Sequence, residues 1–359
     1  MAETILEAVD LKKHFRSGGG LGRKANTVRA VDGVSLQVKK GETFAIVGES
    51  GCGKSTLARL LMRLLEPTEG DAVFDGRSIA DLKGKDLRAL RRDMQFVFQD
   101  PFSSLNPRMT VGKLIGEPLE VHAPELSAKE RRAKVAEMLG RVGLRPEHAD
   151  RYPHEFSGGQ RQRIGIARAL ATGPRVLIGD EPVSALDVSV QAQVINRLHD
   201  LKSEFDLTLV IIAHDLAVIR HMSDRVAVMY LGQIVELGTA DEVFANPRHP
   251  YTRALLSAVP EPVYGQTRDR IALKGETPSP ANPPAGCRFH TRCPFARPDC
   301  ATRAPELREI AGGHSAACHY SEEITAAQAA EVTPEPPRRS AGAERRFAMY
   351  AEATSSQGA

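Results

Sequence analysis

Residues 48–56 combine glycines, a lysine and hydroxyl side chains at the spacing of a phosphate-binding loop. They read Gly48-Glu49-Ser50-Gly51-Cys52-Gly53-Lys54-Ser55-Thr56. Glycines at these positions let backbone N–H groups turn toward phosphates, and the helix that follows points the positive end of its dipole at them. Lys54 can reach the outer phosphates, and Ser55 can ligate magnesium. The pattern therefore predicts a site for a nucleoside triphosphate.

The residues on either side of this loop support that interpretation. An apolar, strand-like run, 44–47, precedes it, and a helix-patterned stretch, 57–65, follows it. The alternative is an ordinary glycine-rich turn between a strand and a helix. Because both flanking elements of a phosphate loop are present, we favour the nucleotide site.

Three other polar groups follow apolar, strand-like runs. Asp180 and Glu181 come after 176–178, His214 ends the run 209–213, and Gln99 follows 94–98. Open α/β sheets bind ligands at the carboxyl ends of their strands. There one carboxylate can hold magnesium while the next orients water. The alternatives are a histidine that only bonds a loop carbonyl, and a surface amide.

A second segment offers free backbone N–H groups. Ser157-Gly158-Gly159-Gln160-Arg161 begins a predicted helix that runs through Arg168. Exposed N–H groups at a helix start bind anions. We therefore predict a second phosphate-binding site in addition to the loop at 48–56.

Composition places these motifs in a folded chain without an obvious charged partner. The chain has 359 residues, 42% of them hydrophobic, with 48 basic against 45 acidic side chains. This length permits two domains and a substantial core. The balanced charge gives no sign of a nucleic-acid partner. Apolar runs are too short to span a membrane, and the N-terminus lacks the pattern of a signal peptide, so we expect a cytosolic chain or one docked on a membrane from the cytosol.

Hydrophobic periodicity predicts a mixed α/β fold. Two strands, 5–15 and 28–38, flank a glycine-rich tip at 17–22, and the region from about 109 to 173 is helical and charged. Strands and helices then alternate from 176 to 222, and a hairpin is expected over 226–236. We expect a helical insert within an α/β domain.

Together these motifs resemble the ATP-binding subunits of ATP-binding cassette (ABC) transporters. The resemblance covers about 3–320 and rests on the phosphate loop, Gln99, the SGGQR segment at 157–161, Asp180-Glu181 with Ser184-Ala185-Leu186-Asp187, and His214. The stretches 97–107, 181–189 and 249–252 look like those of dipeptide/oligopeptide importers, and Val183-Ser184 look like the F-type ATPase subunit. The implied fold is a RecA-like α/β core with an antiparallel β subdomain and a helical subdomain, about 109–173.

The resemblance also implies a role for each motif. Lys54 and the loop bind the phosphates of ATP, Glu181 polarises the attacking water, and His214 contacts the terminal phosphate. Phe15 stacks on adenine, with an ordinary core phenylalanine as the alternative. Mg²⁺ is surrounded by Ser55, Gln99 and Asp180. The other nucleotide contacts in the loop come from Gly48, Ser50, Gly51, Cys52, Gly53 and Thr56.

Partners follow from the same resemblance. Two such subunits form a head-to-tail dimer, in which the segment Ser157, Gly158, Gly159 and Gln160 of one subunit caps the nucleotide held by the other. Two membrane permeases and an extracytoplasmic solute-binding protein complete an importer, with this subunit at the cytoplasmic face of the membrane and no nucleic acid bound. The alternatives are import of nickel or another small solute, a soluble ABC ATPase of DNA repair or translation, and a redox-sensing protein.

Four of the five cysteines gather near the C-terminus: Cys287, Cys293, Cys300 and Cys318. Their spacing is neither that of a zinc ribbon nor that of a ferredoxin, and disulfides are rare in a reducing cytosol. A region with few apolar residues and four thiols suggests an organising metal. The segment 286–293 matches the importer pattern G-C-x-F-x-x-R-C, and this resemblance implies a [4Fe-4S] cluster. Zinc and free thiols are the alternatives.

We accordingly divide the chain into three parts. Residues 1–245 form the ABC ATPase domain, and 246–320 form a linker and a small cysteine-rich, metal-binding region. Beyond these, 321–359 are rich in Ala, Glu, Pro, Ser and Arg and are expected to be a disordered tail.

Overall fold

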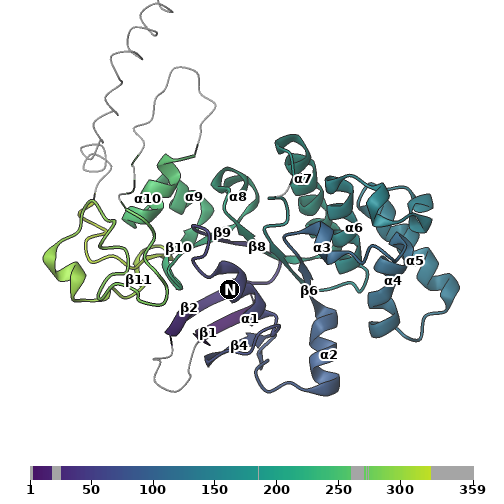
Figure 1. Cartoon of the computed structure of the whole chain (residues 1–359), viewed down its shortest axis with the longest axis horizontal. Helices are drawn as coiled ribbons and strands as arrows, with labels where there is room; N and C mark the ends of the chain where they lie inside the picture. Colours follow the sequence, from purple (N-terminus) through teal and green to yellow (C-terminus); the bar gives the residue numbers. More distant parts are fainter. Residues whose placement is uncertain are drawn as a thin grey trace, which may run out of the picture.

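The computed structural model describes residues 3–17, 26–184, 186–259, 271, 273 and 275–324. The glycine-rich tip from 18 onward, Ala185 and the predicted disordered tail from 325 onward lie outside these residues. Within them, helices and strands form a mixed α/β fold (Figure 1), as predicted. None of the described helices is long and apolar enough to cross a membrane.

The first sheet is antiparallel and has the order β2-β1-β4-β5. Its strands are β1 (Thr4–Ser17), β2 (Asn26–Lys39), β4 (Glu69–Phe74) and β5 (Arg77–Ser78). In the second half of β2, buried residues alternate with exposed ones, because successive side chains of a strand point to opposite faces. The strands predicted at 5–15 and 28–38 are confirmed.

The second sheet has eight strands in the order β11-β12-β10-β9-β3-β8-β7-β6. They are β3 (Thr43–Val47), β6 (Met94–Val97), β7 (Val176–Asp180), β8 (Thr208–Ala213), β9 (Arg225–Tyr230), β10 (Gln233–Thr239), β11 (Arg308–Ala311) and β12 (His314–Ala316). From β9 to β6 the pairing is parallel, whereas β10, β12 and β11 pair antiparallel. The parallel strands bring their carboxyl ends to one edge, where the predicted site residues follow.

The α-helices connect and cover these sheets. They are α1 (Lys54–Leu61), α2 (Gly84–Asp93), α3 (Pro101–Ser104), α4 (Val111–His122), α5 (Ala128–Arg141), α6 (Gly158–Leu170), α7 (Val188–Phe205), α8 (Leu216–Met222), α9 (Ala240–Ala245) and α10 (Pro250–Ser257). The part of the chain that the structure describes also contains three short 3-10 helices, Pro146–Asp150, Pro153–Glu155 and Pro298–Ala301. Helices α4, α5 and α6 lie together at one end of the molecule (Figure 1), within the region predicted to be helical.

The C-terminal region packs against the opposite end of the large sheet (Figure 1). Strand β12 pairs with β10, with Ala316 opposite Glu236, so the hairpin β11–β12 extends the sheet. Phe289 is only 1% exposed and contacts the rings of Tyr230 and Tyr251 at centroid distances of 5.3 and 5.4 Å. The segment expected to be a linker contributes α10 to this packing. Apolar burial and strand pairing therefore hold the region on the sheet.

The iron–sulfur cluster predicted for Cys287, Cys293, Cys300 and Cys318 is wrong. Among the described residues, no group of three or more Cys, His, Asp or Glu is arranged to hold a metal ion, and the zinc alternative fails for the same reason. The four thiols line one small cavity. Burial raises the pKa of Cys293 to about 12 and that of Cys318 to about 11. All four are free cysteines in the structure.

Candidate functional site

The phosphate loop connects the end of β3 to the start of α1, as predicted. Two of its glycines are required by close contacts. Gly48 and Gly53 have φ of +152° and +110°. A Cβ atom on Gly48 would lie 2.2 Å from the Met229 carbonyl oxygen, and one on Gly53 would lie 2.1 Å from that of Ala30. No other residue fits these positions without displacing the backbone, so glycine shapes the loop.

Lys54 lies at the start of α1 and its side chain turns back over the loop. It is only 5% exposed, and its ammonium group donates to the carbonyl oxygens of Gly48 at 2.8 Å and Glu49 at 3.0 Å. These carbonyls satisfy an otherwise buried charge. The ammonium group is therefore positioned above the loop, where phosphate oxygens can replace the carbonyls as its acceptors.

The loop meets the end of β7 through a hydroxyl and a carboxylate. Ser55 Oγ donates to Asp180 Oδ1 at 2.8 Å. Asp180 is 2% exposed, and its burial raises the pKa of the carboxyl group although Ser55 and nearby cations oppose the shift. Hydroxyl and carboxylate oxygens are the hard ligands that Mg²⁺ prefers. The donor set at this edge therefore fits Mg²⁺.

Two more predicted residues converge on one carboxylate oxygen of a third. Gln99 Nε2 donates to Glu181 Oε2 at 2.8 Å, and His214 Nδ1 lies 3.3 Å from the same oxygen. The Glu181 side chain is 15% exposed, whereas that of His214 is 56% exposed. The ends of β6, β7 and β8 thus place an amide, a carboxylate and an imidazole together, beside the Ser55–Asp180 pair.

The backbone at Glu181 is strained. Its φ is +47°, in the left-handed region that side chains with a Cβ rarely adopt. Its N–H donates to the Ile212 carbonyl at 2.9 Å, which ties the residue to β8. Such strain is retained only where the surrounding structure imposes it, and it is concentrated at functional sites. Five other described non-glycine residues also have a positive φ, so this conformation alone assigns no function; here it orients the carboxylate.

Phe15 lies near the end of β1 and is 40% exposed. The ammonium group of Lys13 lies 5.4 Å from its ring centroid. The ring is therefore not part of the core, which was the alternative interpretation. Its partial exposure is compatible with a stacking role.

Ser157 caps α6 and is part of a capping box. Its hydroxyl accepts from the Gln160 N–H at 3.4 Å, and its own N–H donates to Gln160 Oε1 at 3.0 Å. Gly159 is buried, and a Cβ there would lie 2.4 Å from the Val190 side chain. In the part of the chain that the structure describes, no hydrogen bond joins 157–160 to the phosphate loop. Within the described residues the two predicted phosphate sites are therefore not joined by a hydrogen bond.

Contacts from the C-terminal region to the loop were not predicted. The Glu49 N–H donates to the Tyr251 hydroxyl at 2.8 Å, and its carboxylate pairs with Arg292, with 2.7 Å between Nη1 and Oε2. The sequence does contain one indication of such a contact: Glu49 is a carboxylate inside a phosphate-binding loop, and such a charge needs a cation nearby. The spacing of residues along the chain does not identify which cation that is.

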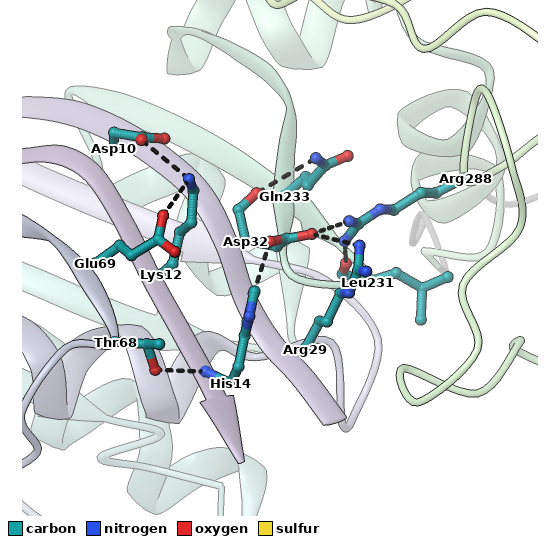
Figure 2. A network of polar contacts seen from close by, with 10 residues as sticks. All are labelled: Asp10, Lys12, His14, Arg29, Asp32, Thr68, Glu69, Leu231, Gln233 and Arg288. Atoms are coloured by element: carbon teal, nitrogen blue, oxygen red, sulfur yellow. Dashed lines mark hydrogen bonds and ion pairs between the residues drawn. The ribbon is translucent and has the colours of Figure 1, made fainter. Parts of the chain in front are cut away.

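A second unpredicted contact joins the C-terminal region to the first sheet. Figure 2 shows Arg288 reaching Asp32 of β2 and the Leu231 carbonyl, while His14 of β1 bonds the same carboxylate. The distance from His14 Nε2 to Asp32 Oδ1 is 2.7 Å. Burial opposes ionisation, yet Arg288 and His14 outweigh it and lower the pKa of Asp32. Asp32 therefore connects the strand that carries Phe15 to the C-terminal region.

Comparisons with known proteins agree with this arrangement. The family model of ABC transporters matches residues 31–184, and that of the oligopeptide/dipeptide transporter C-terminal region matches 235–300. The oligopeptide transport ATP-binding protein AppF of Bacillus subtilis (strain 168) is 58% identical over 321 residues, covering 88% of this chain and 97% of that protein. The oligopeptide transport ATP-binding protein OppF of Escherichia coli (strain K12) is 54% identical over 321 residues, covering 88% and 96%.

Solved structures show the same fold. The ATP-binding cassette MJ0796, in a dimeric post-hydrolysis state bound to ADP and Pi, superposes with a TM-score of 0.59 at 32% identity. The match covers 66% of this chain and 99% of that one. The structure of cbiO1 from Clostridium perfringens, part of the transporter complex cbiONQ, gives a TM-score of 0.58 at 31% identity, covering 68% and 91%.

Proposed function

Because this chain belongs to the ATP-binding subunits of ABC transporters, in the oligopeptide/dipeptide transporter family, we propose that it is the ATPase subunit of a peptide importer. The observation that carries the chemistry is the convergence of Gln99 and His214 on Glu181 Oε2, beside the phosphate loop. The transport ATP-binding proteins AppF and OppF support the choice of peptides as the transported solute.

ATP binding begins at the phosphate loop. Lys54 exchanges the carbonyls of Gly48 and Glu49 for phosphate oxygens, and the loop N–H groups and the start of α1 bind the remaining phosphate charge. Phe15 stacks on the adenine. Ser55, Asp180 and Gln99 would hold Mg²⁺, and the ion would neutralise charge that develops on the phosphates.

Hydrolysis depends on Glu181. Its carboxylate accepts a hydrogen bond from the attacking water and orients it toward the terminal phosphate. In the structure Oε2 accepts from Gln99 and faces His214, so both side chains have to shift as water and phosphate enter. His214, which is largely exposed, then contacts the terminal phosphate.

The active unit is a head-to-tail dimer of ATPase subunits. The segment Ser157–Gln160 makes no hydrogen bond to its own phosphate loop in the described residues, and its helix start suits a phosphate. In our proposal it caps the nucleotide held by the other subunit. The dimeric ADP- and Pi-bound state of MJ0796 supports this arrangement.

The subunit works at the cytoplasmic face of the membrane with two permeases, and a solute-binding protein delivers the peptide. ATP binding closes the dimer and hydrolysis reopens it, which drives the permeases between two states. Residues 1–245 form the ATPase domain, with the helical subdomain at about 109–173 and the antiparallel sheet as a second subdomain. Residues from 246 to about 320 form a C-terminal unit that packs on it.

Replacing Glu181 by Gln tests the proposed chemistry. The substitution keeps a hydrogen-bonding group of the same shape but removes the base, so ATP hydrolysis by the assembled transporter should slow by about 10² to 10⁴-fold. ATP affinity should be retained. A matched control is Glu137→Gln, on the exposed face of α5, which should hydrolyse ATP at the wild-type rate. Near-normal turnover of E181Q would remove Glu181 from this role.

A further inference from the structure

Arg292 contacts the phosphate loop from outside the nucleotide motifs. Its guanidinium forms two parallel contacts with Glu49, Nη1 to Oε2 at 2.7 Å and Nη2 to Oε1 at 3.1 Å. Thr277 Oγ1 donates to the same carboxylate at 2.9 Å. The Arg292 side chain is 8% exposed. Paired arginine–carboxylate contacts of this kind fix geometry as well as charge, so Glu49 is held from the C-terminal region.

The backbone beside Glu49 is held as well. Its N–H donates to the hydroxyl of Tyr251, a buried residue of α10, and its carbonyl accepts from Lys54. Arg292 Nη1 also lies 3.4 Å from the Tyr230 hydroxyl. Every polar group of Glu49 therefore has a partner. The phosphate loop itself supplies two of these contacts, from Lys54 and from the Cys52 N–H at 3.3 Å, and both go to the Glu49 carbonyl.

The carboxylate of Glu49 presents an electrostatic problem for a nucleotide site. Burial favours its neutral form, but hydrogen bonds from Arg292 and Thr277 outweigh burial and lower the pKa of Glu49. Glu49 is therefore ionised at neutral pH, beside a loop that has to accept phosphate anions. Like charges in one partly buried site repel each other. A counter-charge is needed, and among the described residues Arg292 is the group that pairs with this carboxylate.

We propose that Arg292 is a positioning residue for nucleotide binding, which neutralises Glu49 and holds the phosphate loop in the conformation that accepts phosphates. The proposal rests on the nucleotide site assigned above and extends it to the segment 287–293. By reciprocity, anything that displaces this segment weakens nucleotide binding, and bound nucleotide stabilises the docked segment. The C-terminal region thereby becomes a part of the nucleotide site.

Docking of the segment does not depend on Arg292 alone. Arg288 is anchored on Asp32 and the Leu231 carbonyl (Figure 2), and Phe289 is buried against Tyr230 and Tyr251. Removing the Arg292 charge should therefore leave the segment in place. This separation makes a charge effect distinguishable from a loss of docking.

The test is a double-mutant cycle on the full-length chain. The proteins are the wild type, Arg292→Met, Glu49→Gln and the double variant, and the measurement is the dissociation constant of a fluorescent ATP analogue with Mg²⁺. R292M leaves Glu49 uncompensated and should weaken binding at least about tenfold. E49Q removes the repelling charge, so it should cost less than R292M and restore most of the affinity in the double variant.

The same substitution on an exposed pair provides the control. Arg297 pairs with Glu323 at 2.7 Å, but both side chains are about half exposed, at 47% and 57%. R297M should bind nucleotide as the wild type does, and thermal unfolding without nucleotide should show R292M folded. If R292M does not fold, the nucleotide affinity of Arg292→Lys is measured instead. A lysine keeps the positive charge but cannot make the paired contact with Glu49, so this variant should bind nucleotide measurably more weakly than the wild type.

Several results would overturn the inference. One is that R292M binds the ATP analogue with wild-type affinity. If R292M does not fold, wild-type affinity in R292K has the same meaning. Another is a loss in E49Q equal to that in R292M with no recovery in the double variant, since that would make the pair merely structural. Failure of the wild type to bind the ATP analogue would instead contradict the proposed function itself.

Discussion

The phosphate loop and the segment 287–293 contact each other, yet they are stabilised in different ways. The loop depends on backbone conformations available to glycine, as at Gly48 and Gly53, and on one buried lysine. The segment depends on large buried groups, with Phe289 in an aromatic cluster and two arginines on carboxylates. A loop whose shape depends on its backbone conformation can adapt to a ligand, whereas a segment fixed by side-chain packing stays rigid. The segment 287–293 can therefore stabilise the phosphate loop.

The largest expected effect concerns packing. Phe289→Ala should lower the free energy of unfolding by about 3–5 kcal/mol, the usual cost of removing a buried aromatic ring from a site that cannot collapse. Denaturant unfolding of the full-length chain measures it. Leu307→Ala in the same region is the control, because Leu307 is 37% exposed and its loss should cost less than about 1 kcal/mol. Equal costs for the two variants would show that the region is not held by its aromatic cluster.

A smaller effect should appear in the pH dependence of stability. His249 is buried beside Phe289, and burial lowers its pKa from 6.5 to about 4, although Glu236 opposes the shift. Between these values the unfolded chain binds the proton and the folded chain does not. The free energy of unfolding should therefore fall as pH drops from 6.5 toward 4, by on the order of 1.4 kcal/mol per unit from this residue.

His249→Asn isolates that contribution. In the wild type, His249 Nδ1 accepts from the Tyr251 N–H at 3.1 Å and caps α10. Asparagine supplies a capping oxygen without titrating in this range. Unfolding curves at pH 6.5 and 5 should show that the variant loses less stability on acidification than the wild type does. Parallel losses would mean that His249 is not buried in its neutral form.

The same two regions differ in how far the sequence predicts them. Local rules place Asp180, Glu181, Gln99 and His214, because each follows an apolar run and parallel strands end at one edge. The mixed α/β class and most of its strands follow from periodicity in the same way. The strain at Glu181, by contrast, is imposed by tertiary contacts with β8 and has no signal in the sequence.

In the C-terminal region, local rules were misleading. The four cysteines in a region with few apolar residues suggested a metal, and the resemblance of 286–293 to the importer pattern implied a [4Fe-4S] cluster. Spacing along the chain, however, does not specify distances between thiols. The structure uses Phe289 for packing and Arg292 for a pair with Glu49, 243 residues away. Hairpin β11–β12 was missed because it is short and gains its stability from pairing with β10.

Hydrogen exchange of the full-length chain, with and without ATP and Mg²⁺, tests most directly whether the C-terminal region is part of the nucleotide site. The E181Q protein is used because its expected slow hydrolysis should keep the nucleotide intact during the measurement. ATP should slow exchange in the phosphate loop and also in 287–293 and α10, because Arg292 and Tyr251 hold Glu49 from there. Slower exchange in the phosphate loop with no change in 287–293 or α10 would contradict the account.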